Sequence, residues 1–317
     1  MVEGSYAASY TCDVTSRAVR PPVYPRPERP RRALRNRGWV PQHHGAWAMI
    51  TVPILSGIAV GGAQWHHVPL LLMWWVGYFW FYATSQWVKA RRRERYQTAV
   101  RTYAAATTVT GVAVLLCTPW LIGWVVWFAP LLAFSGWCLA RGRERAFYHD
   151  VAIIVAACLT TMVAFDAAAQ PTSLAASVAL DPSGIMRPDG GAWAASATAL
   201  TWAWRVTAVL AGYFLGTIVH VKSLIRERNN PRWWVGSLAW HALLLGASVV
   251  ATTAGWWPCG SGWALIGLAG LTLARSIALP AAARRGVTVR PALIGGVEVA
   301  LSVGFFVLVV TTSLHCM

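Results

Sequence analysis

The most constraining feature of this chain is its shortage of charge. Only 12% of the 317 residues are charged and 56% are hydrophobic, whereas a soluble domain averages about 25% charged residues. The mean hydropathy is +0.48. A water-soluble core of this size could not bury so much apolar surface, and a disordered chain would contain far less of it. The composition therefore excludes an ordinary soluble enzyme and predicts an integral membrane protein.

Nine stretches meet or nearly meet the roughly 20 apolar residues that a membrane-spanning helix needs. They lie at about 46–63, 68–88, 100–118, 120–140, 150–168, 197–221, 234–254, 261–279 and 292–314. Thr118-Pro119 separates the third stretch from the fourth, because proline disfavours a continuing helix. We therefore expect an all-α polytopic membrane protein with about nine transmembrane helices.

The basic residues alternate with these stretches. Of the 27 Lys and Arg residues, 24 lie before the first stretch or after an even-numbered one. This positive-inside pattern predicts a cytoplasmic N-terminus. The net charge of +16 then follows from topology and from contact with anionic membrane lipids. A nucleic-acid partner is not expected.

Two segments lack the apolar pattern. Residues 1–38 combine Arg with Pro21-Pro22 and other prolines, which predicts a disordered basic cytoplasmic tail before a transmembrane domain at 39–317. The tail is either a lipid-attracted arm or a docking segment. The loop at about 169–196 contains turn signals such as Pro188-Asp189-Gly190 and is a candidate lid on the outer face.

The six cysteines show no Cys-x-x-Cys or zinc spacing, so no metal site is expected. Cys117, Cys259 and Cys316 are predicted to lie near the outer face. Two of them could form a disulfide in an oxidising compartment, but the sequence does not select a pair.

The entry to the first stretch, 41–49, reads Pro-Gln-His-His-Gly-Ala-Trp-Ala-Met. His43 and His44 therefore stand at a helix N-terminus, where free N–H groups and the helix dipole favour an anion. An interfacial helix cap is the alternative.

The same stretch resembles the HGAWAM signature of the YwiC-like bacterial membrane proteins. Gly212-Tyr213-Phe214, followed by Lys222, Arg226, Glu227 and Arg228, resembles a second signature of that family. The resemblance covers most of residues 39–316 and implies a place in the bacterial cytoplasmic membrane. Since the family has no firmly assigned activity, the resemblance implies neither a mechanism nor a cofactor.

An internal repeat is a further hypothesis. The pattern Gly-Tyr-Phe followed by K-x-x-x-R-E-R occurs at 77–95 and again at 212–228. A four-helix duplication plus one helix (4+4+1) would place both motifs in cytoplasmic loops. Chance is the alternative, because Arg-Glu-Arg also occurs at 143–145.

The nine-span layout also resembles the UbiA prenyltransferase superfamily, which binds Mg-diphosphate through Asp-rich motifs in the loops after the second and sixth spans. Neither of those loops contains Asp here, although clustered carboxylates are what Mg²⁺ needs. The layout therefore suggests a fold and not an activity.

Ionisable residues inside the predicted spans are costly in hydrocarbon and are functional hypotheses by default. Their depths predict two pairs, Asp166 with Arg205 and Glu298 with Arg275, each a structural ion pair or part of a relay. The remaining candidates are His241 and the span-edge residues His149, Asp150 and His220. Haem ligation by two of the histidines is conceivable, but no spacing selects a pair.

Six residues are predicted to share the cytoplasmic depth: His43, His44, Lys89, Lys222, Arg226 and Glu298. We expect them to line a cytoplasm-facing pocket for an anionic or phosphate-bearing ligand, such as a prenyl-type lipid. Solvated loop charges that only set topology are the alternative. Three other functions stay open: a prenyl-transfer enzyme with an altered site, a small-solute transporter and a non-catalytic subunit of a membrane complex.

Overall fold

A computed structural model describes residues 38–41, 44–168, 197–228, 230–286 and 289–316. All regular elements in these ranges are helical. The α-helices are α1 (His44–Gly61), α2 (His67–Lys89), α3 (Gln97–Cys117), α4 (Val125–Ala140), α5 (Phe147–Ala167), α7 (Ala197–Ile225), α8 (Pro231–Thr253), α9 (Cys259–Arg284) and α10 (Pro291–Cys316). Two 3-10 turns, η2 (Glu94–Tyr96) and η3 (Pro119–Trp124), precede α3 and α4. Each expected apolar stretch corresponds to one of these helices, which confirms the all-α fold.

Within the described parts of the chain, seven helices are long and apolar enough to cross a membrane: α3, α4, α5, α7, α8, α9 and α10. The apolar helix α1 is shorter, with 18 residues. The 23-residue helix α2 carries polar groups such as Tyr78, Tyr82 and Gln86. Nine crossings and a cytoplasmic N-terminus stay predictions. The expected tail, apart from Gly38, and the loop 169–196 lie outside the described residues.

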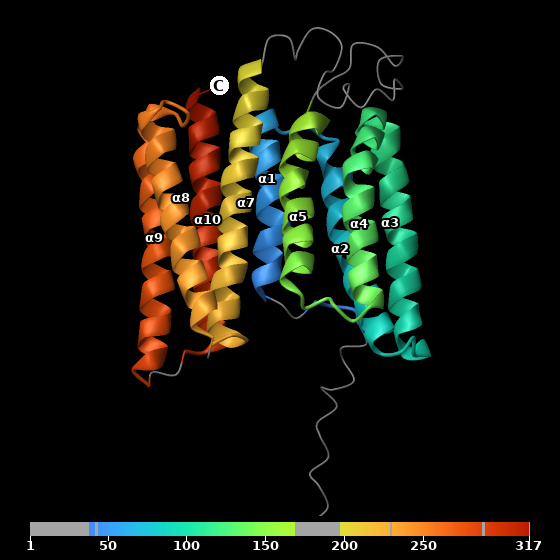
Figure 1. The fold of residues 1–317 in the computed structure, drawn as a ribbon. Coiled ribbons are helices and arrows are strands. Elements are labelled where there is room, and N and C mark those ends of the chain that lie inside the picture. Colours follow the sequence, from blue (N-terminus) through green and yellow to red (C-terminus); the bar gives the residue numbers. More distant parts are fainter. Residues whose placement is uncertain (1–37, 42–43, 169–196, 229, 287–288, 317) are drawn as a thin grey trace, which may run out of the picture. The chain divides into compact units, whose positions relative to one another are not determined.

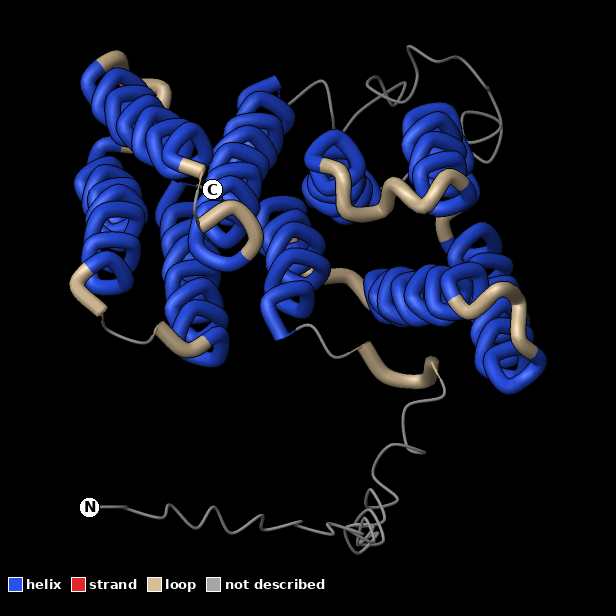
Figure 2. The backbone as a smooth tube through the Cα atoms, turned by 60° about the horizontal axis from the view of Figure 1, so that its bottom comes forward, coloured by secondary structure: helices blue, strands red, loops and turns tan. Residues whose placement is uncertain are grey.

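The helix α1 joins two groups of helices. It packs against α5 and α2 on one side and against α7 and α10 on the other. Figure 1 shows α1 and α5 running side by side between these groups. Figure 2 views the same helices closer to end-on. The C-terminal ends of α2, α7 and α9 and the loop between α4 and α5 lie at the bottom of Figure 1. They are here called the basic end, because they carry Lys89, Lys222, Arg284 and Arg145.

Burial differs strongly between the helices. In α5, 72% of the apolar 18-residue segment that could span a membrane is buried inside the protein, whereas in the corresponding segment of α3 only 6% is buried. The core follows α1, α5 and α7 and includes Ile54, Val60, Ile154, Leu210 and Phe214. The outward side chains of α3, including Val109 and Leu116, are exposed and apolar, as expected for a helix that faces lipid.

Small residues allow α1 and α5 to approach closely. A Cβ atom at Gly57 would overlap the carbonyl oxygen of Thr161, and one at Gly61 would lie 3.0 Å from the carbonyl oxygen of Phe165. The Thr161 hydroxyl donates a hydrogen bond of 3.0 Å to the carbonyl oxygen of Pro53. Close backbone approach and interhelical hydrogen bonds are the main sources of helix association within lipid.

This contact predicts the effect of one methyl group. We expect Gly57→Ala to destabilise the protein by about 1–3 kcal/mol, because overpacking forces the backbones apart. The measurement is the thermal unfolding midpoint of the purified protein in detergent. The matched control is Gly136→Ala in α4, where an added Cβ meets nothing within 4 Å. Equal midpoints for the two variants would contradict the tight α1–α5 contact.

Candidate functional site

A pocket lies at the basic end between α2, α4 and α5. Its volume is about 160 Å³. The lining combines a basic, an acidic and several polar groups with apolar side chains: Tyr78, Phe81, Tyr82, Ser85, Gln86, Lys89, Leu139, Glu144 and His149. Its lining includes Lys89 and His149, two of the residues that the sequence indicates as candidates.

One face of α2 builds a wall of this pocket. Tyr78, Tyr82, Ser85 and Lys89 follow each other at helical spacings of four, three and four residues, so they share a face. Sequence reasoning identified Lys89 but missed its three neighbours. The signal was present, because polar residues at this spacing interrupt an otherwise apolar helix.

Lys89 and Glu144 form an ion pair at the pocket. The distance from Lys89 Nζ to Glu144 Oε1 is 3.4 Å, and the side chains are 40% and 18% exposed. Burial disfavours the charged Glu144 carboxylate, but its own backbone N–H and the Lys89 ammonium outweigh this effect. The pKa of Glu144 is therefore held below its usual value. The single positive charge of the Lys89 ammonium is thus balanced by the single negative charge of Glu144.

His149 fixes the inner wall. Its Nε2 atom lies 2.9 Å from the Ser135 hydroxyl of α4, and its ring stacks on Phe81 of α2 with the centroids 6.5 Å apart. His149 is buried. Contacts from one side chain to two helices hold the basic ends of α2, α4 and α5 together around the pocket.

Lys222 has partners within the protein. Its Nζ atom lies 2.6 Å from Asp150 Oδ2 and donates to the carbonyl oxygen of Arg145 at 3.3 Å. The ammonium also lies over the rings of Phe147 and Trp233. Lys222 is 9% exposed and is absent from the lining of the pocket. It therefore ties α7 to the start of α5.

The other predicted pocket residues lie elsewhere. Arg226 is exposed in the turn after α7, and Glu298 is buried in α10. His43 lies outside the described residues, and the side chain of His44 is not described. The structure therefore does not bring the six predicted residues into one pocket, because Glu298 belongs to a helix that does not pack against α2.

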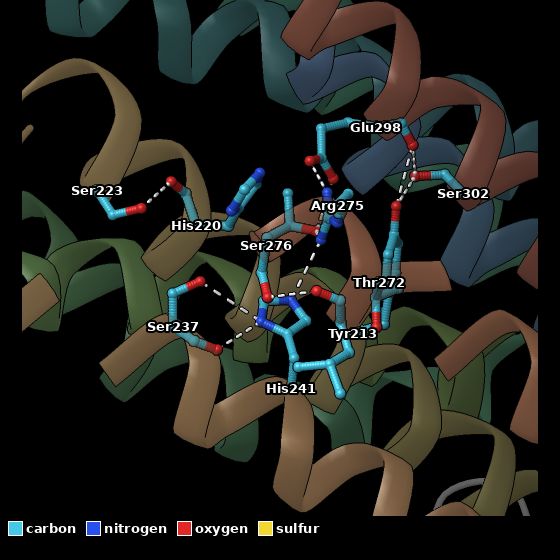
Figure 3. A network of polar contacts seen from close by, with 12 residues as sticks. Tyr213, His220, Ser223, Ser237, His241, Thr272, Arg275, Ser276, Glu298 and Ser302 are labelled. Carbon is cyan, nitrogen blue, oxygen red and sulfur yellow. Dashed lines mark hydrogen bonds and ion pairs between the residues drawn. The ribbon is translucent and has the colours of Figure 1, made fainter. Parts of the chain in front are cut away.

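A second polar group lies inside α7, α8, α9 and α10 (Figure 3). Arg275 and Glu298 form an ion pair there. Thr217 donates to Glu298 Oε2 at 2.9 Å, and the Arg275 guanidinium donates to the Thr217 hydroxyl at 3.2 Å. The Arg275 guanidinium also lies 3.3 Å from His241 Nε2. The depth argument that placed Arg275 beside Glu298 thus agrees with the observed pair.

The expected pair of Asp166 and Arg205 is not formed. Asp166 Oδ2 accepts a hydrogen bond of 2.9 Å from the Trp124 indole, whereas Arg205 donates to the carbonyl oxygen of Trp256 at 2.5 Å. The two residues share a depth but point to different neighbours: Asp166 to η3, and Arg205 to the segment after α8. Depth alone does not define the side of a helix.

Among the described residues, no group of three His, Cys, Asp or Glu side chains could hold a metal ion. Cys117 is a free thiol, as are Cys138 and Cys158. The side chains of Cys259 and Cys316 are not described, so a disulfide between those two stays a hypothesis.

Comparison with known proteins identifies relatives. Residues 40–165 match the model of a family described as "YwiC-like protein". The uncharacterized protein YwiC of Bacillus subtilis (strain 168) is 28% identical over 230 residues, which cover 72% of this chain and 80% of that protein. An uncharacterized protein of Haemophilus influenzae is 24% identical over 207 residues, covering 64% of this chain and 74% of the relative.

The resemblance to YwiC-like bacterial membrane proteins is therefore confirmed. The matched segment runs from the residue before Pro41 to Phe165, in the last turn of α5, and includes the α2, α4 and α5 walls of the pocket. No solved structure matches the chain, and the likeness to the UbiA layout stays a prediction.

The contacts of Lys222 predict a structural effect. We expect Lys222→Ala to lower the free energy of unfolding by about 1–2 kcal/mol, because Asp150 loses a close and largely shielded counter-ion. Thermal unfolding in detergent measures this change. Arg228→Ala, which removes an exposed charge from the next turn, serves as the control. A Lys222→Ala protein as stable as the control would show that the bridge contributes nothing.

The Lys89–Glu144 pair predicts a pH dependence. The lowered pKa of Glu144 means that its contribution to stability is fully present above the usual Glu pKa of about 4.3. The contribution is lost as the pH falls through the lower folded-state value. Because both groups are partly exposed, we expect less than about 1 kcal/mol. Unfolding midpoints of wild type and Glu144→Gln from pH 3 to pH 7 should converge at the acid end, and a constant difference would refute this expectation.

Proposed function

We propose that this YwiC-like membrane protein binds the anionic headgroup of an amphiphile in the pocket between α2, α4 and α5. The observation that carries the proposal is Lys89 in a pocket that has both polar and apolar walls. The positive-inside pattern assigns the basic end to the cytoplasm. We therefore assign the pocket to the cytoplasmic side of the bacterial inner membrane.

The charge around the pocket favours an anion. Lys89 is half-exposed and has one carboxylate partner. Arg141, Arg143 and Arg145 lie in the loop that supplies Glu144, and four arginines follow Lys89 between 91 and 95. Clustered cations beside a membrane surface attract phosphate-bearing lipids and other anions. A phosphate can displace Glu144 from Lys89 without leaving a cation unpaired.

The length of the pocket suits an amphiphile. Tyr78 lies eleven residues before Lys89 on α2, which corresponds to about 16 Å along a helix. Lys89 marks the charged end, whereas Phe81, about two turns earlier in α2, supplies apolar wall further inside. A ligand with a headgroup at Lys89 and a chain directed toward Tyr78 would match this gradient of polarity.

The pocket is a poor match for prenyl transfer through a magnesium diphosphate. Glu144 is the single carboxylate among the described residues of its lining, and a diphosphate-bound Mg²⁺ is held through clustered carboxylates. A binding function is therefore favoured over an altered prenyl-transfer enzyme. A non-catalytic role in a membrane complex is compatible with ligand binding at the same pocket.

The proposal predicts a charge-dependent affinity. We expect the purified protein to bind hexadecyl phosphate and to discriminate against hexadecanol, which has the same chain without the anion. Lys89→Gln should weaken hexadecyl phosphate binding by about tenfold, the usual value of one charge-assisted hydrogen bond. Isothermal titration calorimetry in detergent micelles measures both affinities.

Arg228→Gln is the matched control, because it removes one exposed charge from another loop at the basic end. Its affinity should equal that of wild type. Equal weakening by both substitutions would indicate general surface charge. Equal affinities for hexadecanol and hexadecyl phosphate would contradict the proposal that the pocket recognises an anionic headgroup.

A further inference from the structure

The polar group inside α7 to α10 is built from five buried side chains, here called the Arg275 cluster: Thr217, His220, His241, Arg275 and Glu298. None of them is more than 6% exposed. Ionisable side chains at such positions in a membrane protein are costly and commonly mark binding or transport sites. The cluster shares no residue with the Lys89 pocket, and its role is independent of the function proposed above.

The charges of the cluster balance. Arg275 supplies one positive charge, and Glu298 supplies one negative charge in direct contact with it. Thr217 carries no charge, and both histidines are assigned the neutral form because they are completely buried. His241 Nδ1 lies 2.7 Å from the carbonyl oxygen of Ser237, so Nδ1 carries the proton. Its Nε2 is then the acceptor for Arg275.

His220 is different from every other member of the cluster. It is completely buried, yet neither ring nitrogen has a hydrogen-bond partner. It lies beside His241, with ring centroids 6.1 Å apart. In Figure 3 the dashed line at His220 ends on its backbone carbonyl, which accepts from Ser223, and no dashed line reaches its ring. Arg275 Nε also lacks a hydrogen-bond partner.

These two observations define what is missing. A neutral His220 presents one N–H donor, and Arg275 Nε presents another. Buried donors without acceptors are strongly disfavoured. The group that would complete the cluster is therefore a hydrogen-bond acceptor that lies beside a guanidinium, and an anion is the acceptor that a guanidinium favours most.

We infer that the Arg275 cluster is a binding site for a small monovalent anion, held by Arg275 and His220 and taken up together with one proton on Glu298. An anion alone would leave the buried cluster with a net negative charge. Protonation of the Glu298 carboxylate as the anion replaces it on Arg275 keeps the sum at zero. Electroneutrality is decisive in a medium of low dielectric constant, where an unpaired charge is expensive.

The packing restricts the size of the anion. A Cβ atom on Gly216 would lie 2.8 Å from the Trp240 ring and 3.0 Å from His241 Nε2, so α7 and α8 are in close contact beside the cluster. Arg275 is the one cation among the five side chains. A small anion with a single charge, in the class of chloride, nitrate or acetate, fits these limits better than a phosphate.

Glu298 is the group to which the proton is assigned. The helices packed against α10 are α1, α7 and α9. From α7, Tyr213 and His220 face this region, and Tyr213 donates to the backbone carbonyl of Glu298 at 3.0 Å. Arg275 faces it from α9, and His241 lies behind Arg275 on α8. The described side chains of α1 include no ionisable group.

The test measures anion binding and proton uptake together. Purified full-length protein is titrated with chloride, nitrate and acetate by calorimetry in a gluconate background, using buffers with different ionisation enthalpies. For at least one of the three anions, we expect about one proton to be taken up per anion. Its affinity should rise about tenfold for each unit of pH decrease, as linkage of one proton requires.

Two variants separate the roles of the pair. Glu298→Gln fixes a neutral side chain, so binding should lose its pH dependence and its proton uptake. The double variant Arg275→Gln/Glu298→Gln removes both charges, stays electroneutral and should bind no anion. Gel filtration and thermal unfolding establish that each variant is folded. If Glu298→Gln does not fold because Arg275 loses its counter-ion, the test rests on whether the folded double variant binds the anion.

His220 and an exposed arginine supply the last comparison. His220→Leu should weaken binding of the anion at least tenfold, whereas Arg228→Gln, which removes an exposed charge outside both sites, should leave the affinity unchanged. The inference is overturned by any of three results: none of the three anions binds wild type, binding takes up no proton, or the folded double variant binds like wild type.

Discussion

The close contact between α1 and α5 is the interaction on which the rest of this structure depends. It needs glycine at positions 57 and 61, where any side chain would meet the backbone of α5. Helix α1 also packs against α7 and α10, so the same element joins the helices of the Lys89 pocket to those of the Arg275 cluster. In lipid, where apolar surface alone gives little driving force, such close packing is what holds helices together.

The charged residues inside and beside the bundle follow a second constraint, which is that each needs a nearby counter-charge or dipole. Arg275 meets Glu298, and Lys222 meets Asp150. Their environments differ. Lys89 is half-exposed beside Glu144, where exchange of one anion for another is inexpensive. The buried Arg275 pair can exchange its anion only if charge is conserved.

Particular residues show how far sequence reasoning reached. Lys89 lies in a pocket at the basic end, and Arg275 lies beside Glu298 at the depth expected from span positions. Lys222 lies at the basic end, as expected, but forms an ion pair with Asp150. The sequence did not predict this partner, because helix spacing gives the depth of a residue and not the identity of its neighbours. Asp166 and Arg205 differ for the same reason: each contacts a tryptophan or its backbone on a different side. Glu144 lies in a loop and His149 lies at the start of a helix. No periodic sequence pattern at such positions indicates which residues they will contact.

The sequence by itself determined the all-α membrane class, the approximate position of every described α-helix and the likeness to YwiC-like proteins, since these depend on local composition and on short motifs. Tertiary structure decided which polar groups meet. The rotation of each helix about its axis and the order in which helices pack are set by contacts far apart in the chain, such as Gly57 with Thr161. Those contacts place Lys89 and Glu298 in separate sites although both were expected at one depth, because residues at the same depth can lie on opposite sides of a bundle.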